Sequence, residues 1–250
     1  MLVLNGYFDE SGTHDGSDAV AVAGYLSTAE QWDAFDGDWS AALGQWGVRH
    51  FHMTDFANGA KPFDTWSAEE RHTRFAVLTQ IIHAHVIASV GWVIPTRLYD
   101  AIVSDTAKRY TGGPYGLAAV GCFIDAAHLL RPTFPASRIA YVFEHGARGA
   151  GQVLKVFQQN MADPAQRTEL MMQSLKFEGK EFVPLQAADI LAYELHKHLP
   201  RQTGLDQRPQ RTRHLTMLAR VKHIWGHLDE GELRKWSGVL ELATKHQTFG

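Results

Sequence analysis

The sequence predicts a single α/β domain with a mixed sheet, flanking helices and a C-terminal helical appendage. Apolar runs of strand length alternate along the chain with longer segments of helical spacing. The first two strand-like runs are separated by a short segment of turn-forming residues, which indicates an antiparallel hairpin. A chain of 250 residues, 45% of them hydrophobic and 20% charged, has the composition of one globular unit. We therefore expect a domain over residues 1–200 and a helical extension over residues 201–250 that packs on it.

The first elements are a hairpin and a helix. Residues 2–9 and 19–26 are the two apolar runs of the hairpin, and the residues between them are rich in Gly, Ser and Asp. A helix is expected over residues 28–46, because large apolar residues recur there every three or four positions. These residues are Trp32, Phe35, Trp39 and Leu43. We expect them to pack into the core rather than to bind a cofactor.

Local start and stop signals mark the next elements. Residues 50–53 are expected to form a short strand. Ser67 and Glu70 have the spacing of a capping box, which predicts a helix from there to about residue 85. Residues 86–94 then have the pattern of a strand, which Pro95 ends.

The central part of the chain predicts two helices, a strand and a third helix. The two helices cover residues 96–110 and 114–130, since a Thr-Gly-Gly segment separates them and prolines follow the second. Residues 138–144 are rich in aromatic and β-branched residues and predict a strand. A glycine-rich turn over residues 146–151 leads into a helix that ends near residue 161.

The C-terminal part predicts one more strand and three helices. The strand covers residues 174–178, and the helix over residues 184–199 is nearly apolar on all sides in its first half, which indicates burial. A polar linker begins at residue 201. Helices are then expected over residues 212–227 and 230–245.

Two acidic residues stand at the ends of apolar strands. Asp9 ends the first strand, in phase with Tyr7, and Glu144 ends the strand over residues 138–144. α/β sheets place their functional sites at the carboxyl ends of strands. An aspartate at the position of Asp9 also caps hairpin turns, which is the structural alternative.

A third acidic residue, Asp189, lies inside the helix that is expected to be buried. Burying an ionised carboxylate costs several kcal/mol unless a cation or hydrogen-bond donors compensate. Gln186, three residues before, and Tyr193, four residues after, lie on the same helix face and are expected to support it. We therefore expect a functional role for Asp189.

Two motifs resemble a known family. They are Tyr7-Phe8-Asp9-Glu10-Ser11-Gly12 and Leu185-Gln186-Ala187-Ala188-Asp189-Ile190-Leu191-Ala192-Tyr193. As a pair, in this order, they resemble the bacterial domain-of-unknown-function family numbered three thousand eight hundred, which is grouped with the ribonuclease H-like superfamily. The resemblance implies a ribonuclease H-like mixed sheet. It also implies a metal-dependent nuclease site built from Asp9, Glu144 and Asp189, with Glu10 and Ser11 as supporting residues.

The resemblance leaves the fourth metal ligand open. Asp125 lies on the helix before the fourth strand, the helix that usually supplies an acid in ribonuclease H-like proteins. His52 and Asp55 lie in a segment that resembles a histidine-containing segment of the family. We expect Asp55 as the ligand and His52 as a supporting residue. A turn acid and a packed histidine are the alternatives, and a transition-metal site made with His50 is another.

Carboxylate ligands suit hard cations, so Mg²⁺ or Mn²⁺ is the expected cofactor. Two such ions roughly 4 Å apart would activate water and stabilise the leaving oxygen in the hydrolysis of a phosphodiester bond. Lys176, on the strand before the late helix, is the candidate for neutralising phosphate or orienting the nucleophile. An exposed strand lysine is the alternative. His145, beside Glu144, is the candidate for proton transfer.

Charge is unevenly distributed, although the net charge is only −3. Acidic residues dominate residues 1–70 and basic residues dominate residues 197–222. Arg208, Arg211 and Arg213 in the basic segment are the candidate nucleic-acid contacts. A solvated surface is the alternative. The expected partner is a DNA or RNA substrate, and a homo-oligomer or a partner protein is left open.

The sequence also excludes several classes of protein. No apolar run has the length of a transmembrane helix, and the N-terminal run lacks the features of a signal peptide, so we expect a cytoplasmic protein with no membrane partner. One cysteine, Cys122, excludes a disulfide framework and a cysteine-based zinc site. The alternatives to a nuclease are a non-catalytic nucleic-acid-binding module and a nucleotide phosphohydrolase.

Overall fold

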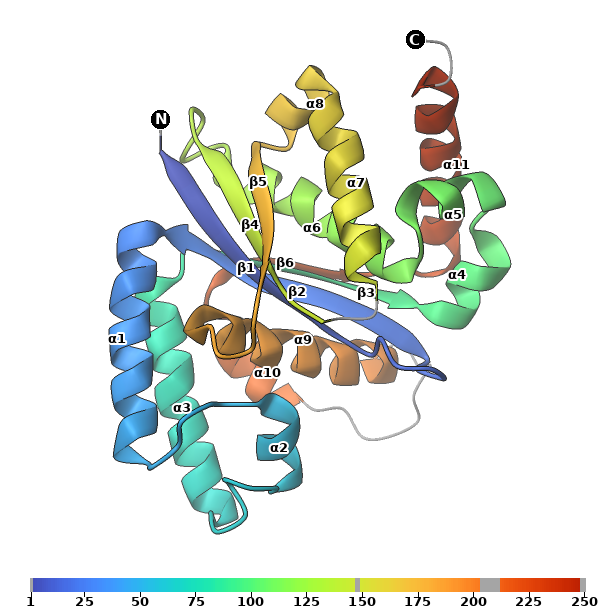
Figure 1. The fold of residues 1–250 in the computed structure, drawn as a ribbon. Coiled ribbons are helices and arrows are strands. Elements are labelled where there is room, and N and C mark those ends of the chain that lie inside the picture. Colours follow the sequence, from blue (N-terminus) through green and yellow to red (C-terminus); the bar gives the residue numbers. More distant parts are fainter. Residues whose placement is uncertain (1, 147–148, 203–211, 248–250) are drawn as a thin grey trace.

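The computed structural model describes residues 2–146, 149–202 and 212–247, which form an α/β fold around one six-stranded sheet (Figure 1). The order of the strands across the sheet is β5-β4-β1-β2-β3-β6. Their bounds are β1 Val3–Ser11, β2 Ala19–Thr28, β3 Ala88–Pro95, β4 Arg138–Glu144, β5 Met172–Glu178 and β6 Lys222–His227.

The sheet is mixed. Strands β1, β2 and β3 are antiparallel neighbours, whereas β4 is parallel to β1, β5 is parallel to β4, and β6 is parallel to β3. The turn-forming residues after β1 return the chain directly to β2, so the predicted antiparallel hairpin is confirmed. The predicted α/β class with a mixed sheet is confirmed as well.

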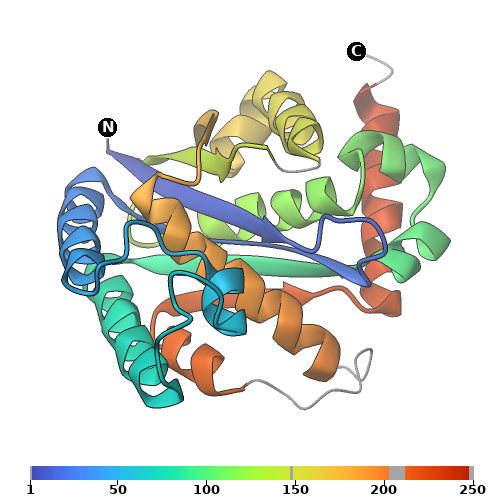
Figure 2. The ribbon, with the colours of Figure 1, turned by 60° about the horizontal axis from the view of Figure 1, so that its bottom comes forward.

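Helices cover both faces of the sheet (Figures 1 and 2). One face is covered by α1 Ala29–Gln45, α2 Met53–Asn58, α3 Ala68–His85, α9 Val183–Gln202 and α10 Thr212–Leu218. The other face is covered by α4 Thr96–Ile102, α5 Asp105–Thr111, α6 Pro114–Leu130, α7 Ala150–Ala162, α8 Pro164–Glu169 and α11 Glu230–Gln247. Below, we name them the α9 face and the α6 face.

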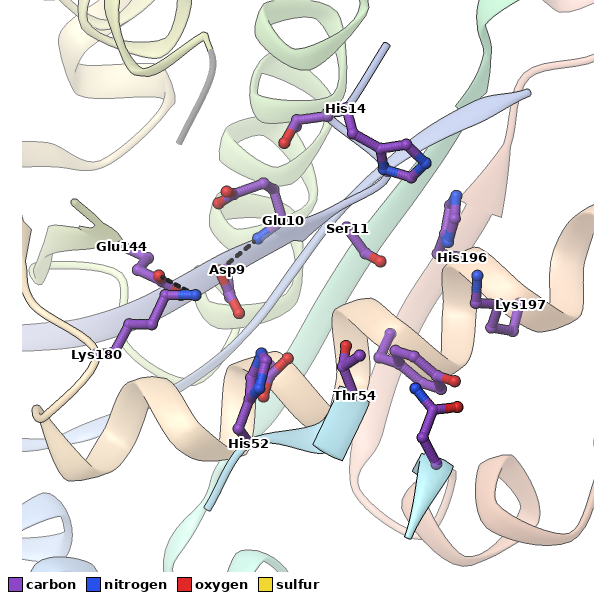
Figure 3. A pocket seen from close by; sticks show the side chains of 15 residues that line it. Asp9, Glu10, Ser11, His14, His52, Thr54, Glu144, Lys180, His196 and Lys197 are labelled. Carbon is purple, nitrogen blue, oxygen red and sulfur yellow. Dashed lines mark hydrogen bonds and ion pairs between the residues drawn. The ribbon is translucent and has the colours of Figure 1, made fainter. Parts of the chain in front are cut away.

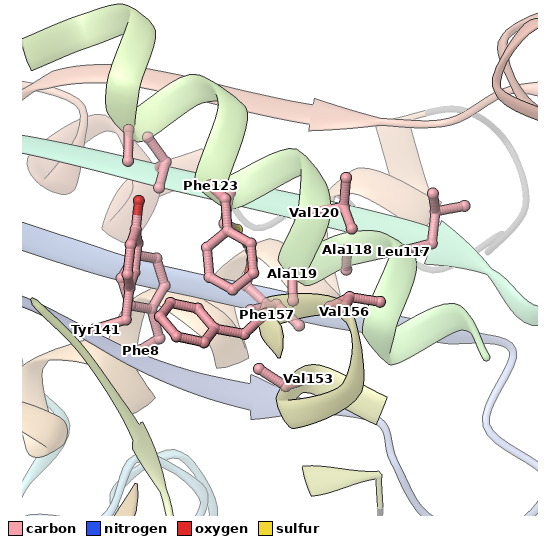
Figure 4. Close-up of a cluster of buried hydrophobic side chains, with 14 of the residues drawn as sticks. Phe8, Leu117, Ala118, Ala119, Val120, Phe123, Tyr141, Val153, Val156 and Phe157 are labelled. Atoms are coloured by element: carbon pink, nitrogen blue, oxygen red, sulfur yellow. Dashed lines mark hydrogen bonds between the residues drawn. The ribbon is translucent and has the colours of Figure 1, made fainter. Parts of the chain in front are cut away.

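Two apolar clusters follow from the alternation of side chains along the strands. In β1, Phe8 points to the α6 face, whereas Tyr7 points to the α9 face. On the α6 face, Phe123 of α6 meets Tyr141 of β4 with ring centroids 4.6 Å apart, close to Phe157 of α7 (Figure 4). The sheet is thus buried on both sides, which explains why its central strands are almost wholly apolar.

Several predicted helix boundaries are confirmed by capping contacts. The hydroxyl of Thr28 accepts a hydrogen bond from the backbone of α1, and Ser67 and Glu70 form a complete capping box at the start of α3. The first half of α9 is buried, as its apolar composition predicts. These signals are local and need no tertiary information.

The strand predicted over residues 50–53 is wrong. The backbone N–H of Phe51 donates to Gln186 Oε1 at 3.0 Å, and the N–H of Met53 donates to Asp189 Oδ2 at 2.7 Å. Side chains of α9 therefore satisfy donors that would otherwise pair with a strand. The chain instead enters α2 at Met53, after His52.

The helix predicted over residues 212–227 is wrong in its second half. Helix α10 ends at Leu218, and residues 222–227 form β6, which pairs with the edge of β3. The indole of Trp225 on β6 donates to the hydroxyl of Ser89 on β3 at 3.1 Å. The C-terminal segment is therefore only partly helical, because it supplies an edge strand to the same sheet.

Two smaller helix predictions also need correction. The helix predicted over residues 96–110 is divided into α4 and α5, because Ser104 caps a new helix start through the N–H of Ala107. The short helix α8 was not predicted. Among the described residues, no helix by itself is long and apolar enough to cross a membrane, and α5 with α6 reach that length only as a pair bent by 67°.

Candidate active site

The strand register brings Asp9 and Glu144 together. Phe8 of β1 lies opposite Phe143 of the parallel strand β4. The next residues of the two strands, Asp9 and Glu144, therefore lie side by side with their side chains on the α9 face. Both carboxylates are buried, with 3% and 7% of their surface exposed. The prediction that these strand ends share one site is consistent with this placement.

Helix α9 adds Asp189 to the same place. The helix crosses β1 and β2 on this face, and Asp189 lies between its buried residues with one oxygen, Oδ2, accepting the N–H of Met53. Gln186, one turn earlier, accepts from the indole of Trp39 at 3.1 Å as well as from the backbone of Phe51. Gln186 therefore fixes the segment that precedes α2 rather than contacting the acids.

The acids line a pocket of about 660 Å³ (Figure 3). Asp9, Glu10, Glu144 and Asp189 form one part of its wall, and Ser11 lies beside them. The remainder is polar or basic. It includes Thr13, His14, His52, Thr54, Asn58, Lys180, Tyr193, His196 and Lys197.

A second pocket, of about 570 Å³, adjoins the first. Glu10, Glu144 and Lys180 line both, so the two form a continuous depression over the ends of β1 and β4. His145 lines the second pocket with an exposed side chain, and its backbone N–H donates to the carbonyl of Glu178 at 2.7 Å. His145 is thus near the acids but in the neighbouring part of the depression.

Burial and the repulsion of neighbouring acids raise the pKa values of Asp9 and Asp189. Burial, with the charges of Glu10, Asp189 and Glu144, raises the pKa of Asp9 well above its usual range, and a hydrogen bond with Glu144 favours its protonated form. Burial raises the pKa of Asp189 to about 6, against the opposing effects of the Met53 N–H and His52. A cation at this place would relieve the repulsion.

The fourth carboxylate beside the others belongs to Glu10. Its backbone N–H donates to Asp9 Oδ1 at 2.8 Å, and its own side chain accepts the hydroxyl of Tyr115 from α6 at 3.4 Å. Burial and the charge of Glu144 raise the pKa of Glu10 to about 7. Glu10 is thus one of four acids that line the pocket, whereas the sequence predicts only a supporting role for it.

Lys180 is a residue that sequence reasoning missed. It lies in the turn between β5 and α9, and its Nζ donates to Glu144 Oε1 at 3.1 Å. Burial lowers the pKa of Lys180, but the hydrogen bond and charge of Glu144, together with Asp9 and Asp189, outweigh burial and raise it. The available signal was its position just after a strand parallel to β4, at the edge of the sheet that carries the acids.

The predicted lysine, Lys176, does not line the pocket. Its Nζ forms an ion pair with Glu178 at 2.8 Å, and its side chain is 54% exposed. Lys176 is thus an exposed lysine on a strand, which is the alternative that the sequence analysis names. The cation beside the acids comes from the turn four residues later.

His52 and Asp55 form a pair at the start of α2. His52 Nδ1 lies 2.9 Å from Asp55 Oδ2. His52 lines the pocket, whereas Asp55 does not. Asp125, the other candidate for a fourth ligand, lies on α6 and accepts the indole N–H of Trp92 at 2.6 Å, outside the pocket. The structure therefore brings neither Asp55 nor Asp125 into the group of acids.

The predicted basic contacts are only partly described. Arg208 and Arg211 lie outside the described residues. Arg213 is exposed on α10 and lines neither pocket. Lys197, at the start of the basic segment, does line the pocket of the acids.

The donor set fits a hard divalent cation by its chemistry, because every candidate ligand is a carboxylate oxygen. The positions of these side chains do not form a complete coordination site. Among the residues that the structure describes, no group of three or more His, Cys, Asp or Glu side chains is positioned to hold a metal ion. One oxygen of each acid is also engaged, by the Glu10 N–H, the Met53 N–H or Lys180. Ligation therefore requires rotation of these side chains and release of Glu144 by Lys180.

The chain matches no protein-family model, no curated protein and no solved structure. The interpretation of the site therefore depends on its own geometry and on the motifs in the sequence.

Proposed function

We propose that the protein is a ribonuclease H-like, divalent-metal-dependent nuclease that hydrolyses phosphodiester bonds of DNA or RNA. One observation carries the proposal: Asp9, Glu144 and Asp189 come from three separate elements and line one pocket. They occupy the first strand, the fourth strand and the late helix, the positions that the family resemblance implies. None of them is needed to form the apolar core.

Asp9, Glu144 and Asp189 would hold Mg²⁺ or Mn²⁺, with Glu10 close enough to support them. Bound ions of this kind activate water and stabilise the leaving oxygen in a displacement at phosphorus. The candidates for proton transfer in the site are His52 and Asp55. Asp55 lies 2.9 Å from His52 Nδ1 and would orient the ring, so that the other ring nitrogen, Nε2, would be available for proton transfer in the pocket.

A polymer fits the site better than a mononucleotide. The pocket continues into its neighbour, so the acids lie in an extended depression rather than in a closed cavity. Lys197 lines the part of the first pocket away from Glu144 (Figure 3), and His14 lines both pockets. The ammonium group of Lys197 can contact the phosphates of a strand that passes over the acids.

The test is cleavage of labelled single-stranded DNA, duplex DNA, RNA and RNA/DNA hybrid with Mg²⁺ or Mn²⁺, beside a panel of nucleoside triphosphates. The wild type is compared with Asp9→Asn and Asp189→Asn. Loss of an outer-shell partner of a metal costs about 10–100-fold in activity, so loss of a ligand should cost more than about 100-fold. The matched control is Asp125→Asn, an acid on the α6 face that should keep full activity.

The outcomes separate the candidate functions. Cleavage of a polynucleotide that survives both substitutions would reject this site, and cleavage of nucleotides alone would indicate a phosphohydrolase. The ion pair between Lys180 and Glu144 favours a second candidate, a non-catalytic nucleic-acid-binding module, because it occupies one of the three acids. Binding of a labelled strand without cleavage, under any metal condition, would support that module.

A further inference from the structure

The turn that carries Lys180 is anchored beside the acids. The N–H of Phe182 donates to the carbonyl of Gly179 at 3.0 Å, which closes the turn between β5 and α9. The ring of Phe182 stacks on Tyr7 of β1, with centroids 5.7 Å apart. The backbone of Lys180 is thereby fixed at the edge of the pocket, whereas its side chain is 60% exposed.

The ammonium group of Lys180 lies where a cation is favoured. Its partner, Glu144, has a side chain that is only 10% exposed, and the charges of Asp9 and Asp189 act on the same ammonium group. Figure 3 shows the lysine side chain extended from its turn toward Glu144 and Asp9. One end of this lysine is thus held among the acids, and its stem lies open to solvent.

We propose that Lys180 is a built-in counter-ion that competes with the divalent metal for Glu144 and thereby sets the metal affinity of the site. The inference rests on the proposed metal-dependent function. Both cations need the same carboxylate, and two positive charges within a few ångströms repel each other. In the metal-free protein Lys180 compensates the buried acids, and on metal binding its exposed side chain turns toward solvent and leaves Glu144 to the ion.

The test measures binding of Mn²⁺ alone by isothermal titration calorimetry. Lys180→Gln keeps the length and polarity of the side chain but removes its charge, so its affinity for Mn²⁺ should rise about ten-fold. Lys180→Arg keeps the charge and should stay within about three-fold of the wild type. The matched control is Lys176→Gln, because the side chain of Lys176 is similarly exposed, 54% against 60% for Lys180, but pairs with Glu178 outside the pocket.

A second readout is the melting temperature, with folding checked by circular dichroism. Without metal, Lys180→Gln should melt below the wild type, since its acids lack their counter-ion. Saturating Mn²⁺ should then raise its melting temperature by more than that of the wild type. Lys176→Gln should follow the wild type in both conditions.

Equal Mn²⁺ affinity of wild type and Lys180→Gln would overturn the inference and leave the proposed metal site intact. Binding by neither protein would overturn both. Binding by Asp9→Asn/Lys180→Gln that is as tight as binding by Lys180→Gln would place the ion elsewhere, and that result would also overturn both. A ten-fold gain that the Asp9→Asn change removes would support them together.

Discussion

The two faces of the sheet differ where Phe8 and Asp9 of β1 lie beside Phe143 and Glu144 of β4. On the α6 face, Phe8, Phe143 and Phe123 form an aromatic layer. On the α9 face, one residue further along each strand, Asp9 and Glu144 replace that layer with buried acids. Because buried acids without a cation are costly, we expect them to weaken the metal-free fold.

The largest effect is expected on the α6 face. Phe123→Ala removes a buried ring that contacts Tyr141 and Phe143, and it should lower the free energy of unfolding by about 3–5 kcal/mol. Urea denaturation measures this change. Mn²⁺ affinity of the folded variant should be unchanged. A loss below about 1 kcal/mol would show that this face is not the main source of stability.

The next effect is a pH dependence that comes from the acids of the pocket. The folded pKa values of Asp189 and Glu10 are about 6 and about 7, above the ordinary 3.8 and 4.5. The folded state thus binds more protons than the unfolded state, so stability is fully present below about pH 4 and is lost as the pH rises through 7. The contribution of Asp189 is roughly 2–3 kcal/mol.

Urea denaturation in EDTA between pH 4 and pH 8 measures this slope. The control is Asp189→Asn, which should flatten it. Saturating Mg²⁺ should reverse the trend, because a metal binds the ionised carboxylates and its affinity rises with pH. A metal-free protein that gains stability between pH 5 and pH 7 would contradict the assigned protonation of the site.

A smaller gain is expected from neutralising one acid. Asp9→Asn keeps the oxygen that accepts the Glu10 N–H and removes the cost of ionising a buried carboxyl group among other acids, so it should stabilise the metal-free protein at pH 8 by about 1–2 kcal/mol. Thermal unfolding in EDTA measures the gain. The same variant should gain nothing from added Mn²⁺. A destabilised Asp9→Asn would mean that the charge itself is needed for the fold.

The main parts of the site could be predicted because they depend on local patterns. Alternation along β1 and β4 assigns Asp9 and Glu144 to one face, and the apolar neighbours of Asp189 in α9 mark it as an unusual acid. Their meeting in one pocket needs only the parallel pairing of β1 with β4 and the packing of α9. These are properties of strands and helices, which the sequence indicates well.

The remaining parts depend on contacts between distant segments. Residues 50–53 have the pattern of a strand, but their donors meet Gln186 and Asp189, more than 130 positions away. The side chains of strand β6 are exposed or half-buried, so its apolar pattern is weak. It forms a strand because it pairs with the edge of β3. Lys180, rather than Lys176, reaches the acids because of the way its flexible side chain extends from a turn. The periodicity of the sequence does not predict that position.

The smallest expected effect sharpens the comparison of the faces, because Asp125 is a partly buried acid on the α6 face that lies outside the pocket of the acids. Burial raises the pKa of Asp125, but its carboxylate accepts the indole N–H of Trp92, which opposes the rise. Asp125→Asn keeps an acceptor for that indole and relieves no repulsion between acids, so the free energy of unfolding should change by less than about 0.5 kcal/mol. Thermal unfolding in EDTA at pH 8, beside Asp9→Asn, measures the difference. Equal gains in the two variants would mean that burial alone, rather than the crowding of carboxylates, makes Asp9 costly. A gain in Asp9→Asn alone would assign that cost to the group of acids, as expected of a site that awaits a cation.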